Sequence, residues 1–256
     1  MDLELNGKVA LVTGGSRGIG RAIVEQLADE GCDVLVVSRN AEADATLSAS
    51  AARSGRRLVA CNADLSTLEG TECAVERAEQ VFGRLDILVN NAGSARRADF
   101  FELTESDWDA GFALKFFGYV RMTRLAWPML KESKGSITNI VGVSAWTPEA
   151  VYAIAGSSNA ALLAFTKSMA ALGDRDGIRV NAVNPGQIET DRMKGVLKAM
   201  GGSEQDARTR LLRELNMRRL GRPRDIAAMV AFLASPRAEY VQGSLIDVDG
   251  GRTRGL

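Results

Sequence analysis

The chain has 256 residues, an ordinary size for one α/β domain. Acidic and basic residues balance at 32 each, so the composition gives no reason to expect nucleic acid or an anionic membrane as a partner. The absence of histidine excludes imidazole acid/base catalysis, Ser-His-Asp triads and histidine-ligated metals. Proton transfer must therefore use lysine, tyrosine, serine or carboxylates, and we expect no metal site.

The cysteines and the N-terminus indicate the compartment. Cys32, Cys61 and Cys73 form an odd set without C-x-x-C spacing, which argues against a disulfide framework or a zinc site. The first residues are acidic where a signal peptide is basic, and no apolar run approaches the roughly 18 residues that span a bilayer. We therefore expect a soluble, unprocessed protein in the cytoplasm.

The first predicted unit is a strand, a glycine turn and a helix. The β-branched run Lys8–Thr13 leads into the turn, and a helical pattern follows through Glu30. Glycines let backbone N–H groups approach a diphosphate, and a helix N-terminus favours negative charge, although tight turns also need glycine for steric reasons. We expect the following turn residues to bind a dinucleotide: Gly14, Ser16, Arg17, Gly18, Ile19 and Gly20.

The end of the second predicted strand, Asp33–Ser38, indicates which dinucleotide is bound. An acidic residue here binds the ribose 2′-hydroxyl of NAD, whereas a basic residue accommodates the 2′-phosphate of NADP. This chain has Arg39, with Arg17 in the glycine turn. The two arginines are either solvated surface groups or phosphate ligands, and we favour NADP(H) over NAD(H).

Strands and helical patterns alternate along the rest of the chain. Further strands are expected at Leu58–Asn62, Leu85–Asn90, Ile137–Val141, Ile178–Asn184 and Ser244–Val248, and helices include Leu68–Phe82 and Thr104 to about Lys131. This alternation predicts an α/β fold of Rossmann type, a doubly wound parallel sheet of about seven strands with helices on both faces, forming a single domain over 1–256. The charged segment Thr190–Met217 is either a mobile lid over the crevice or a fixed helical hairpin.

Several motifs together resemble those of the short-chain dehydrogenase/reductase (SDR) family, over essentially the whole chain. They are T-G-G-S-R-G-I-G at Thr13–Gly20, A-D-L at Ala63–Leu65, N-N-A-G at Asn90–Gly93, N-P-G-x-I-x-T at Asn184–Thr190 and G-R-P-x-D-I-A at Gly221–Ala227. The resemblance implies further cofactor-binding residues: Asp64 and Leu65 at the adenine, Asn91, Ala92 and Gly93 beside them, and Pro185, Gly186, Ile188 and Thr190 at the nicotinamide. It also implies a homo-oligomer, either a dimer or a tetramer.

The same resemblance shows that the family's Asn-Ser-Tyr-Lys tetrad is missing. The tyrosine and lysine of the family lie four residues apart on one helical face, before the letters A-A-L, which places Ala155 and Asn159 at these positions. The customary step of thirteen residues back from the tyrosine places Gly142 at the serine. The asparagine of N-x-x-G becomes Lys115.

Loss of the tyrosine hydroxyl removes the group that would protonate the product alkoxide, which is typically worth about 10² to 10⁴ in rate. The lysine and the asparagine of the family have changed places in this chain: Lys115 stands at the asparagine position and Asn159 at the lysine position. Lys115 lies among phenylalanines, where desolvation lowers the pKa of an amine, unless the side chain extends to solvent. Tyr152 either supplies a substitute hydroxyl or packs at a helix start.

The leading hypothesis is an NADP(H)-dependent oxidoreductase with a rewired proton relay, acting on an apolar carbonyl or alcohol substrate. Its candidate catalytic residues are Lys115, Tyr152 and Asn159, and its substrate pocket would contain Trp146, Phe116, Phe117 and Tyr152. One alternative is a lysine enzyme without net redox change, such as a retro-aldol, decarboxylation or elimination catalyst. Another is a non-catalytic NADP(H)-binding sensor or subunit.

Overall fold

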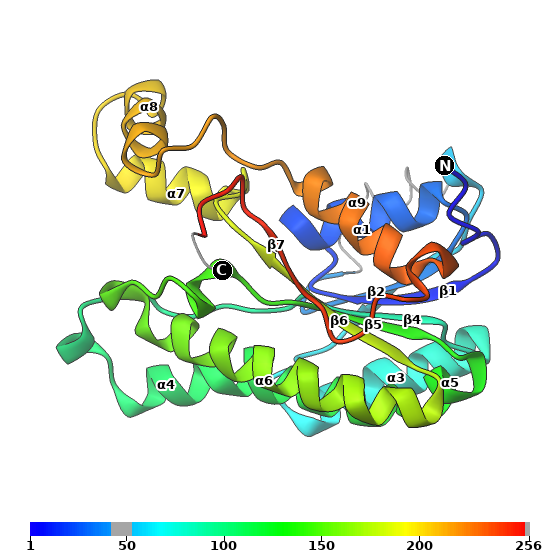
Figure 1. Ribbon diagram of the computed structural model, residues 1–256. Helices are drawn as coiled ribbons and strands as arrows, with labels where there is room; N and C mark the ends of the chain where they lie inside the picture. Colours follow the sequence, from blue (N-terminus) through cyan, green and yellow to red (C-terminus); the bar gives the residue numbers. More distant parts are fainter. Residues whose placement is uncertain (42–52, 254–256) are drawn as a thin grey trace.

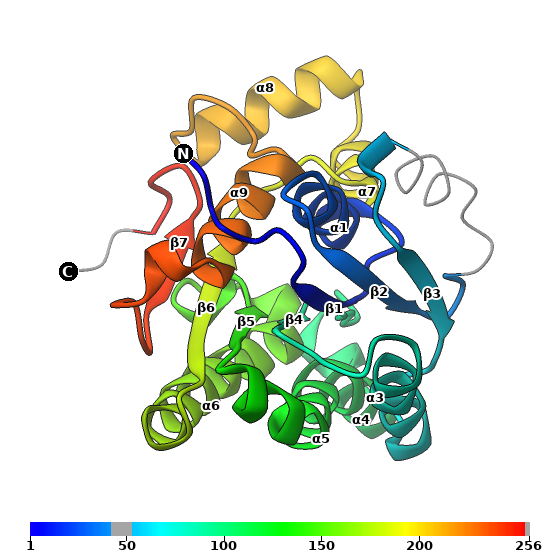
Figure 2. The same cartoon turned by 90° about the vertical axis from the view of Figure 1, so that its right-hand side faces the viewer.

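The computed structural model describes residues 1–41 and 53–253, in which seven parallel strands form one sheet in the order β3-β2-β1-β4-β5-β6-β7 (Figures 1 and 2). The strands are β1 Val9–Thr13, β2 Asp33–Ser38, β3 Leu58–Asn62, β4 Ile87–Asn90, β5 Ser136–Ile140, β6 Arg179–Pro185 and β7 Leu245–Val248. All seven lie at their predicted positions. The largest shift is at β4, which begins at Ile87 rather than Leu85.

Helices cover both faces of the sheet, so the predicted Rossmann-type fold is confirmed. They are α1 Gly18–Asp29, α3 Leu68–Phe82, α4 Glu105–Phe112, α5 Gly118–Ser133, α6 Ala153–Asp176, α7 Asp191–Ala199, α8 Glu204–Glu214 and α9 Pro223–Ala234. Helices α1 and α9 pack against one face, and α3, α5 and α6 against the other (Figure 2). The helical pattern expected between β2 and β3 falls largely on 42–52, outside the described residues. No described helix is long and apolar enough to cross a bilayer.

Two apolar layers hold the sheet between the helices. Strand β5 contributes to both layers. Its Ile137 lies in the cluster on the α3 and α5 side, whereas Ile140 lies in the cluster on the α1 and α9 side. Strands buried on both faces carry nearly continuous apolar runs, which is why the sequence pattern located them correctly.

The strand order reverses between β1 and β4, and ligands of open parallel sheets bind beyond the carboxyl ends of the strands at such a point. The Asn91 side chain, just after β4, donates to the carbonyl oxygens of Thr13 (2.9 Å) and Gly14 (3.1 Å), just after β1. The two family-like loops are therefore fixed to one another, and the crevice begins here.

The predicted helix from Thr104 to about Lys131 is not one regular helix. Thr104 caps α4, which ends at Phe112; a π-helical turn follows over Ala113–Phe117, and α5 then continues to Ser133. The regular-helix prediction was wrong at this turn because residue types do not reveal whether backbone hydrogen bonds span four residues or five. Such turns often occur at functional sites, and this one carries Lys115.

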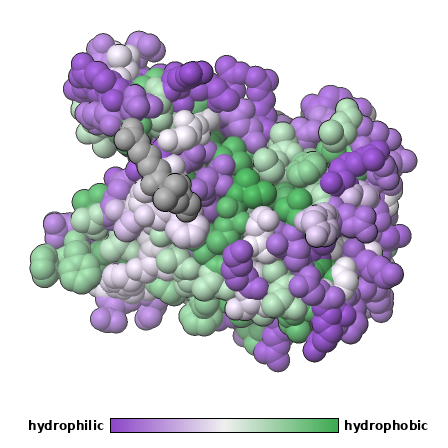
Figure 3. Space-filling view, in the orientation of Figure 1, coloured by the Kyte–Doolittle hydropathy of each residue, from purple (hydrophilic) through white to green (hydrophobic). Residues whose placement is uncertain are grey.

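The segment predicted as a lid forms the helices α7 and α8, joined by a short glycine-containing connection. It has a small core of its own, made by Met193, Leu197, Ala207 and Leu220. In Figure 3 its outward surface, at the upper left, is mostly hydrophilic. Its role as a lid stays a prediction.

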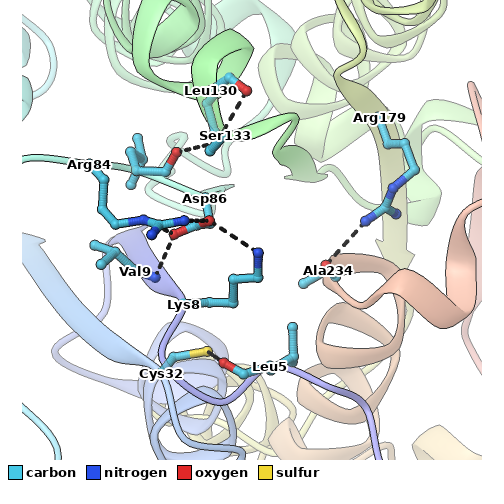
Figure 4. A network of polar contacts seen from close by, with 11 residues as sticks. Leu5, Lys8, Val9, Cys32, Arg84, Asp86, Leu130, Ser133, Arg179 and Ala234 are labelled. Carbon is cyan, nitrogen blue, oxygen red and sulfur yellow. Dashed lines mark hydrogen bonds and ion pairs between the residues drawn. The ribbon is translucent and has the colours of Figure 1, made fainter.

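At the amino end of the strands, Asp86 joins two chain segments (Figure 4). Its carboxylate is 3 % exposed and accepts hydrogen bonds from the Val9 N–H (3.0 Å), from Lys8 (3.3 Å) and twice from Arg84 (2.6 and 3.0 Å). The carboxylate therefore ties the start of β1 to the start of β4.

We expect Asp86→Ala to lower the free energy of unfolding by about 2 to 3 kcal/mol, because it leaves the buried Val9 N–H without its acceptor and removes two charge-assisted contacts. Urea unfolding measures this change. The control is Asp29→Ala, which breaks an exposed ion pair with Arg53 and should cost less than about 0.5 kcal/mol. Equal costs for the two variants would contradict the role given to Asp86.

Candidate active site

The glycine turn after β1 fits a dinucleotide diphosphate. Gly14 and Gly18 have φ angles of +65° and +56°, which favour glycine. A Cβ on Gly20 would lie 2.2 Å from the Gly14 carbonyl oxygen, so the turn closes only without a side chain there. Helix α1 begins at Gly18, and Arg17 before it provides no side-chain cap. The first N–H groups of the helix are thus available to an anion.

The predicted adenosine side lies at the ends of β2 and β3. Arg39 is exposed, and neither it nor Arg17 forms a hydrogen bond or ion pair with another described residue. The Asp64 carboxylate accepts from the N–H and the hydroxyl of Ser66, which, with Arg39 nearby, lower the pKa of the carboxyl. Leu65 is buried in the core, so an adenine contact there would use its backbone.

The predicted nicotinamide residues follow β6 and fold back over the glycine turn. A Cβ on Gly186 would lie 2.7 Å from Asp249, so this strand end also needs glycine. Ile188 forms a β-bridge with Gly221, and the methyl group of Thr190 lies 3.3 Å from the point where a Gly18 Cβ would be. The structure thus places the residues expected at the nicotinamide against the glycine turn.

Lys115 extends from the π-helical turn to the carboxyl end of β5. Its partly buried ammonium donates to the carbonyl oxygens of Val141 (2.9 Å) and Ile140 (3.4 Å), and it lies 5.9 Å from the centre of the Tyr119 ring. A Cβ on Gly93 would lie 3.0 Å from the Lys115 Cδ, so the lysine crosses directly over the loop after β4. The amine therefore sits between two strand ends of the crevice.

Burial lowers the pKa of Lys115 to about 7, and the positive charge of Arg192 acts in the same direction. The lysine therefore exchanges a proton near neutral pH, which an ordinary lysine does not. The side chain is partly buried and its amine donates to two backbone carbonyl groups, as expected of a desolvated amine rather than of one that extends to solvent. Its part in the reaction stays a prediction.

The other three tetrad positions are Gly142, Ala155 and Asn159, and the first and last of them lie side by side. Asn159 is 4 % exposed; its amide donates to the Ser144 hydroxyl (2.7 Å), while its Oδ1 has no partner among the described residues. A Cβ on Gly142 would lie 3.0 Å from the Asn159 Nδ2, so the two residues are neighbours. Ala155, at the position of the tyrosine, is buried. No hydroxyl therefore occupies either family position.

Tyr152 is held by a residue that the sequence did not single out. Its hydroxyl lies 3.2 Å from Arg192 Nη1, and Arg192 Nη2 donates to the Gly93 carbonyl oxygen at 3.0 Å. The Arg97 guanidinium lies 5.4 Å from the centre of the Tyr152 ring. Arg192 lies on α7, far along the chain from both partners, so no local pattern could have revealed it.

The predicted aromatic pocket is only partly assembled. Phe116 and Phe117 are in ring contact at 5.3 Å, but among the described residues neither is in ring contact with Trp146 or Tyr152. Phe117 is 47 % exposed, and the indole N–H of Trp146 donates to Asp247 at 3.2 Å. These side chains do not make one apolar wall. Within the described ranges, no group of three His, Cys, Asp or Glu residues is arranged to hold a metal ion.

A family model described as "Enoyl-(Acyl carrier protein) reductase" matches residues 14–253. The chain belongs to the short-chain dehydrogenase/reductase family. The 3-oxoacyl-[acyl-carrier-protein] reductase of Vibrio cholerae is 36% identical over 250 residues, which are 97% of this chain and 98% of that one. Since the family model and this relative describe reductases, the chain is an oxidoreductase of the SDR family.

Solved SDR structures match along the whole chain. The L-sorbose reductase of Gluconobacter frateurii, complexed with NADPH and L-sorbose, is 33% identical with a TM-score of 0.93 and complete coverage of both chains. An NADPH-bound short-chain oxidoreductase of Pseudomonas aeruginosa, described as containing an atypical catalytic center, is 33% identical with a TM-score of 0.90, covering 97% of this chain and 98% of that one. Another solved relative holds NADH.

The lowered pKa of Lys115 predicts a specific pH dependence of stability. The folded protein has a lysine pKa of about 7 and the unfolded chain one near 10.5, so between these values the unfolded state binds more protons. The contribution of this group to the free energy of unfolding therefore rises with pH across that window. Below about pH 7 the folded protein bears the full cost of burying the charged ammonium.

We expect the stability of the wild type, measured relative to Lys115→Met, to rise as the pH is raised from about 7 toward about 10. Urea unfolding of both proteins across this range measures the difference. The variant Lys131→Met shows the effect of removing an exposed lysine. A difference between wild type and Lys115→Met that does not change with pH would contradict the desolvated amine.

Proposed function

We propose that this SDR oxidoreductase uses NADP(H) to reduce a carbonyl compound to an alcohol, and the reverse, with Lys115 in place of the missing tyrosine as proton donor. The observation that carries the proposal is the position of the Lys115 ammonium. It lies at the carboxyl end of β5, 2.9 Å from the Val141 carbonyl oxygen and beside the Gly142–Asn159 pair that replaces the family's serine and lysine.

When bound, NADPH supplies the hydride to the substrate carbonyl carbon. Lys115 donates a proton to the carbonyl oxygen, becomes a neutral amine and takes up a proton from solvent. The carbonyl groups of Ile140 and Val141 orient the ammonium without neutralising it. Since its pKa is about 7, the amine exists in both protonation states at neutral pH and can serve both reaction directions.

Asn159 is proposed to help bind the cofactor. Its buried Oδ1 has no partner among the described residues, and its amide is occupied by Ser144 at 2.7 Å. A hydroxyl of the cofactor ribose would give this oxygen the donor that it lacks. The Asn159 side chain would thus bind the ribose, while Tyr152 and Arg192 border the substrate side, with α7 and α8 closing over it as a lid.

Lys115 also supports a second candidate function, a lysine enzyme without net redox change. A neutral amine near pH 7 is the nucleophile that forms a Schiff base with a carbonyl substrate. Borohydride added with a carbonyl compound should then label Lys115 covalently. A compound that the enzyme reduces with NADPH, yet which leaves Lys115 unlabelled, would exclude this function. The homo-oligomer and the cytoplasmic location stay predictions.

We expect purified protein to oxidise NADPH with aldehydes or ketones, and Lys115→Met to lower kcat by at least about 10²-fold because the proton donor is lost. In the wild type the rate of reduction should fall as the pH rises above about 7, since only the ammonium donates a proton. Steady-state kinetics across pH measures both effects.

Lys131→Met provides the control for this kinetic test, because Lys131 is exposed and pairs with Asp176 at the far end of α5. It should keep wild-type kinetics. A Lys115→Met protein that is folded and fully active, or a screen of many carbonyl compounds without turnover, would contradict the proposal.

The cofactor preference is assigned to Arg39, which is exposed at the end of β2 without an ion-pair partner among the described residues. We expect Arg39→Ala to weaken NADPH binding by about tenfold or more and to leave NADH binding nearly unchanged, because only NADPH carries the 2′-phosphate. Binding is measured by cofactor fluorescence. Arg56→Ala, at the opposite end of β3, serves as control. Tighter binding of NADH than of NADPH by the wild type would overturn the assignment.

A further inference from the structure

The guanidinium of Arg192 bridges the two sides of the crevice. It reaches from the first turn of α7 to the Gly93 carbonyl oxygen at 3.0 Å and to the Tyr152 hydroxyl at 3.2 Å. Both of these partners are neutral. They use two of the five N–H groups of the side chain, so a further ligand can bind to the others.

Neighbouring arginines differ from Arg192 in their counter-charges. Arg97, whose guanidinium lies over the Tyr152 ring, pairs with Glu149, and Arg252 pairs with the same carboxylate at 2.9 Å. Arg192 has no carboxylate partner among the described residues. Of these three arginines, Arg192 is thus the one without a carboxylate partner in the part of the chain that the structure describes.

Lys115 lies on the other side of the same glycine. Its Nζ is 3.4 Å from the point where a Gly93 Cβ would be, while Arg192 bonds to the Gly93 carbonyl oxygen. The charge that influences the Lys115 amine is that of Arg192, and no acidic side chain among the described residues offsets it. Two cationic side chains thus lie against the same glycine, and mutual repulsion opposes having both of them charged.

We infer that Arg192 binds a carboxylate of the substrate, so that the carbonyl compound of the proposed function is an oxo acid, which the enzyme reduces to a hydroxy acid. The planar fork of a guanidinium matches a carboxylate by two parallel hydrogen bonds. A bound carboxylate also offsets the repulsion that Arg192 exerts on the Lys115 ammonium. Substrate binding therefore favours the protonated amine that the reduction needs.

The reaction balances with the groups already named. The oxo acid takes a hydride from NADPH at its carbonyl carbon and a proton from Lys115 at its oxygen, and gives the hydroxy acid and NADP⁺. The carboxylate stays ionised on Arg192 throughout. Solvent returns the proton to Lys115.

The inference rests on the proposed function, and the test separates the two. Reduction of an aryl oxo acid is compared with that of the corresponding neutral amide, using wild type and Arg192→Gln. We expect kcat/KM for the acid to fall by about 10²-fold in Arg192→Gln, with the amide changed less than about threefold. The control is Lys194→Gln on the same helix. It removes an exposed cation that pairs with Asp191. It should leave both substrates unaffected.

A binding measurement without turnover completes the test. Phenylacetate and phenylacetamide are titrated into the protein–NADPH complex and followed by cofactor fluorescence. We expect the anion to bind wild type at least about tenfold more tightly than the amide, and this preference to disappear in Arg192→Gln. Such a result supports the role of Arg192 even if no carbonyl compound is reduced, in which case the proposed function alone fails.

Three results would overturn the inference. One is reduction of neutral carbonyl compounds as efficiently as of their acids, which leaves the proposed function intact. Another is the absence of any preference for phenylacetate over phenylacetamide in the wild type. The third is a loss of NADPH affinity in Arg192→Gln that equals the loss of oxo-acid reduction, since Arg192 would then bind a phosphate of the cofactor.

Discussion

The proposed chemistry depends on one contact, the hydrogen bond from the Lys115 ammonium to the Val141 carbonyl oxygen at 2.9 Å. Backbone carbonyls orient a cation but do not neutralise it, so desolvation keeps its pKa near 7. The contact requires the π-helical turn, which directs the lysine toward β5, and a glycine at position 93, since a Cβ there would lie 3.0 Å from the lysine Cδ. Helix, loop and strand end are thus built around this side chain.

The site is also adapted to the absence of the family's hydroxyl groups. Gly142 has a φ angle of +141°, which a serine rarely adopts, and a side chain there would crowd the Asn159 amide at 3.0 Å. Ala155, at the tyrosine position, is buried and carries no hydroxyl. Restoring the serine alone would therefore strain the backbone at position 142.

Sequence reasoning found the strands and the glycine turn because their signals are local. Parallel strands buried on both faces are continuous apolar runs, and a turn that must close against Gly14 admits only glycine at position 20. Family spacing assigned Gly142 and Asn159 to two tetrad positions, and the structure places them in contact. The π-helical turn was missed because residue types do not reveal whether backbone hydrogen bonds span four residues or five. Arg192 was missed because its partner Gly93 is 99 residues away.

The most direct measurement of the central claim is an NMR titration of protein labelled with ¹³C at the lysine side chains. If Lys115 is the desolvated amine, we expect one lysine signal to titrate near pH 7, well below the ordinary lysine range. This signal should be missing from the spectrum of Lys115→Met. If every lysine signal titrates above about pH 10, Lys115 is an ordinary ammonium group and does not replace the tyrosine as proton donor.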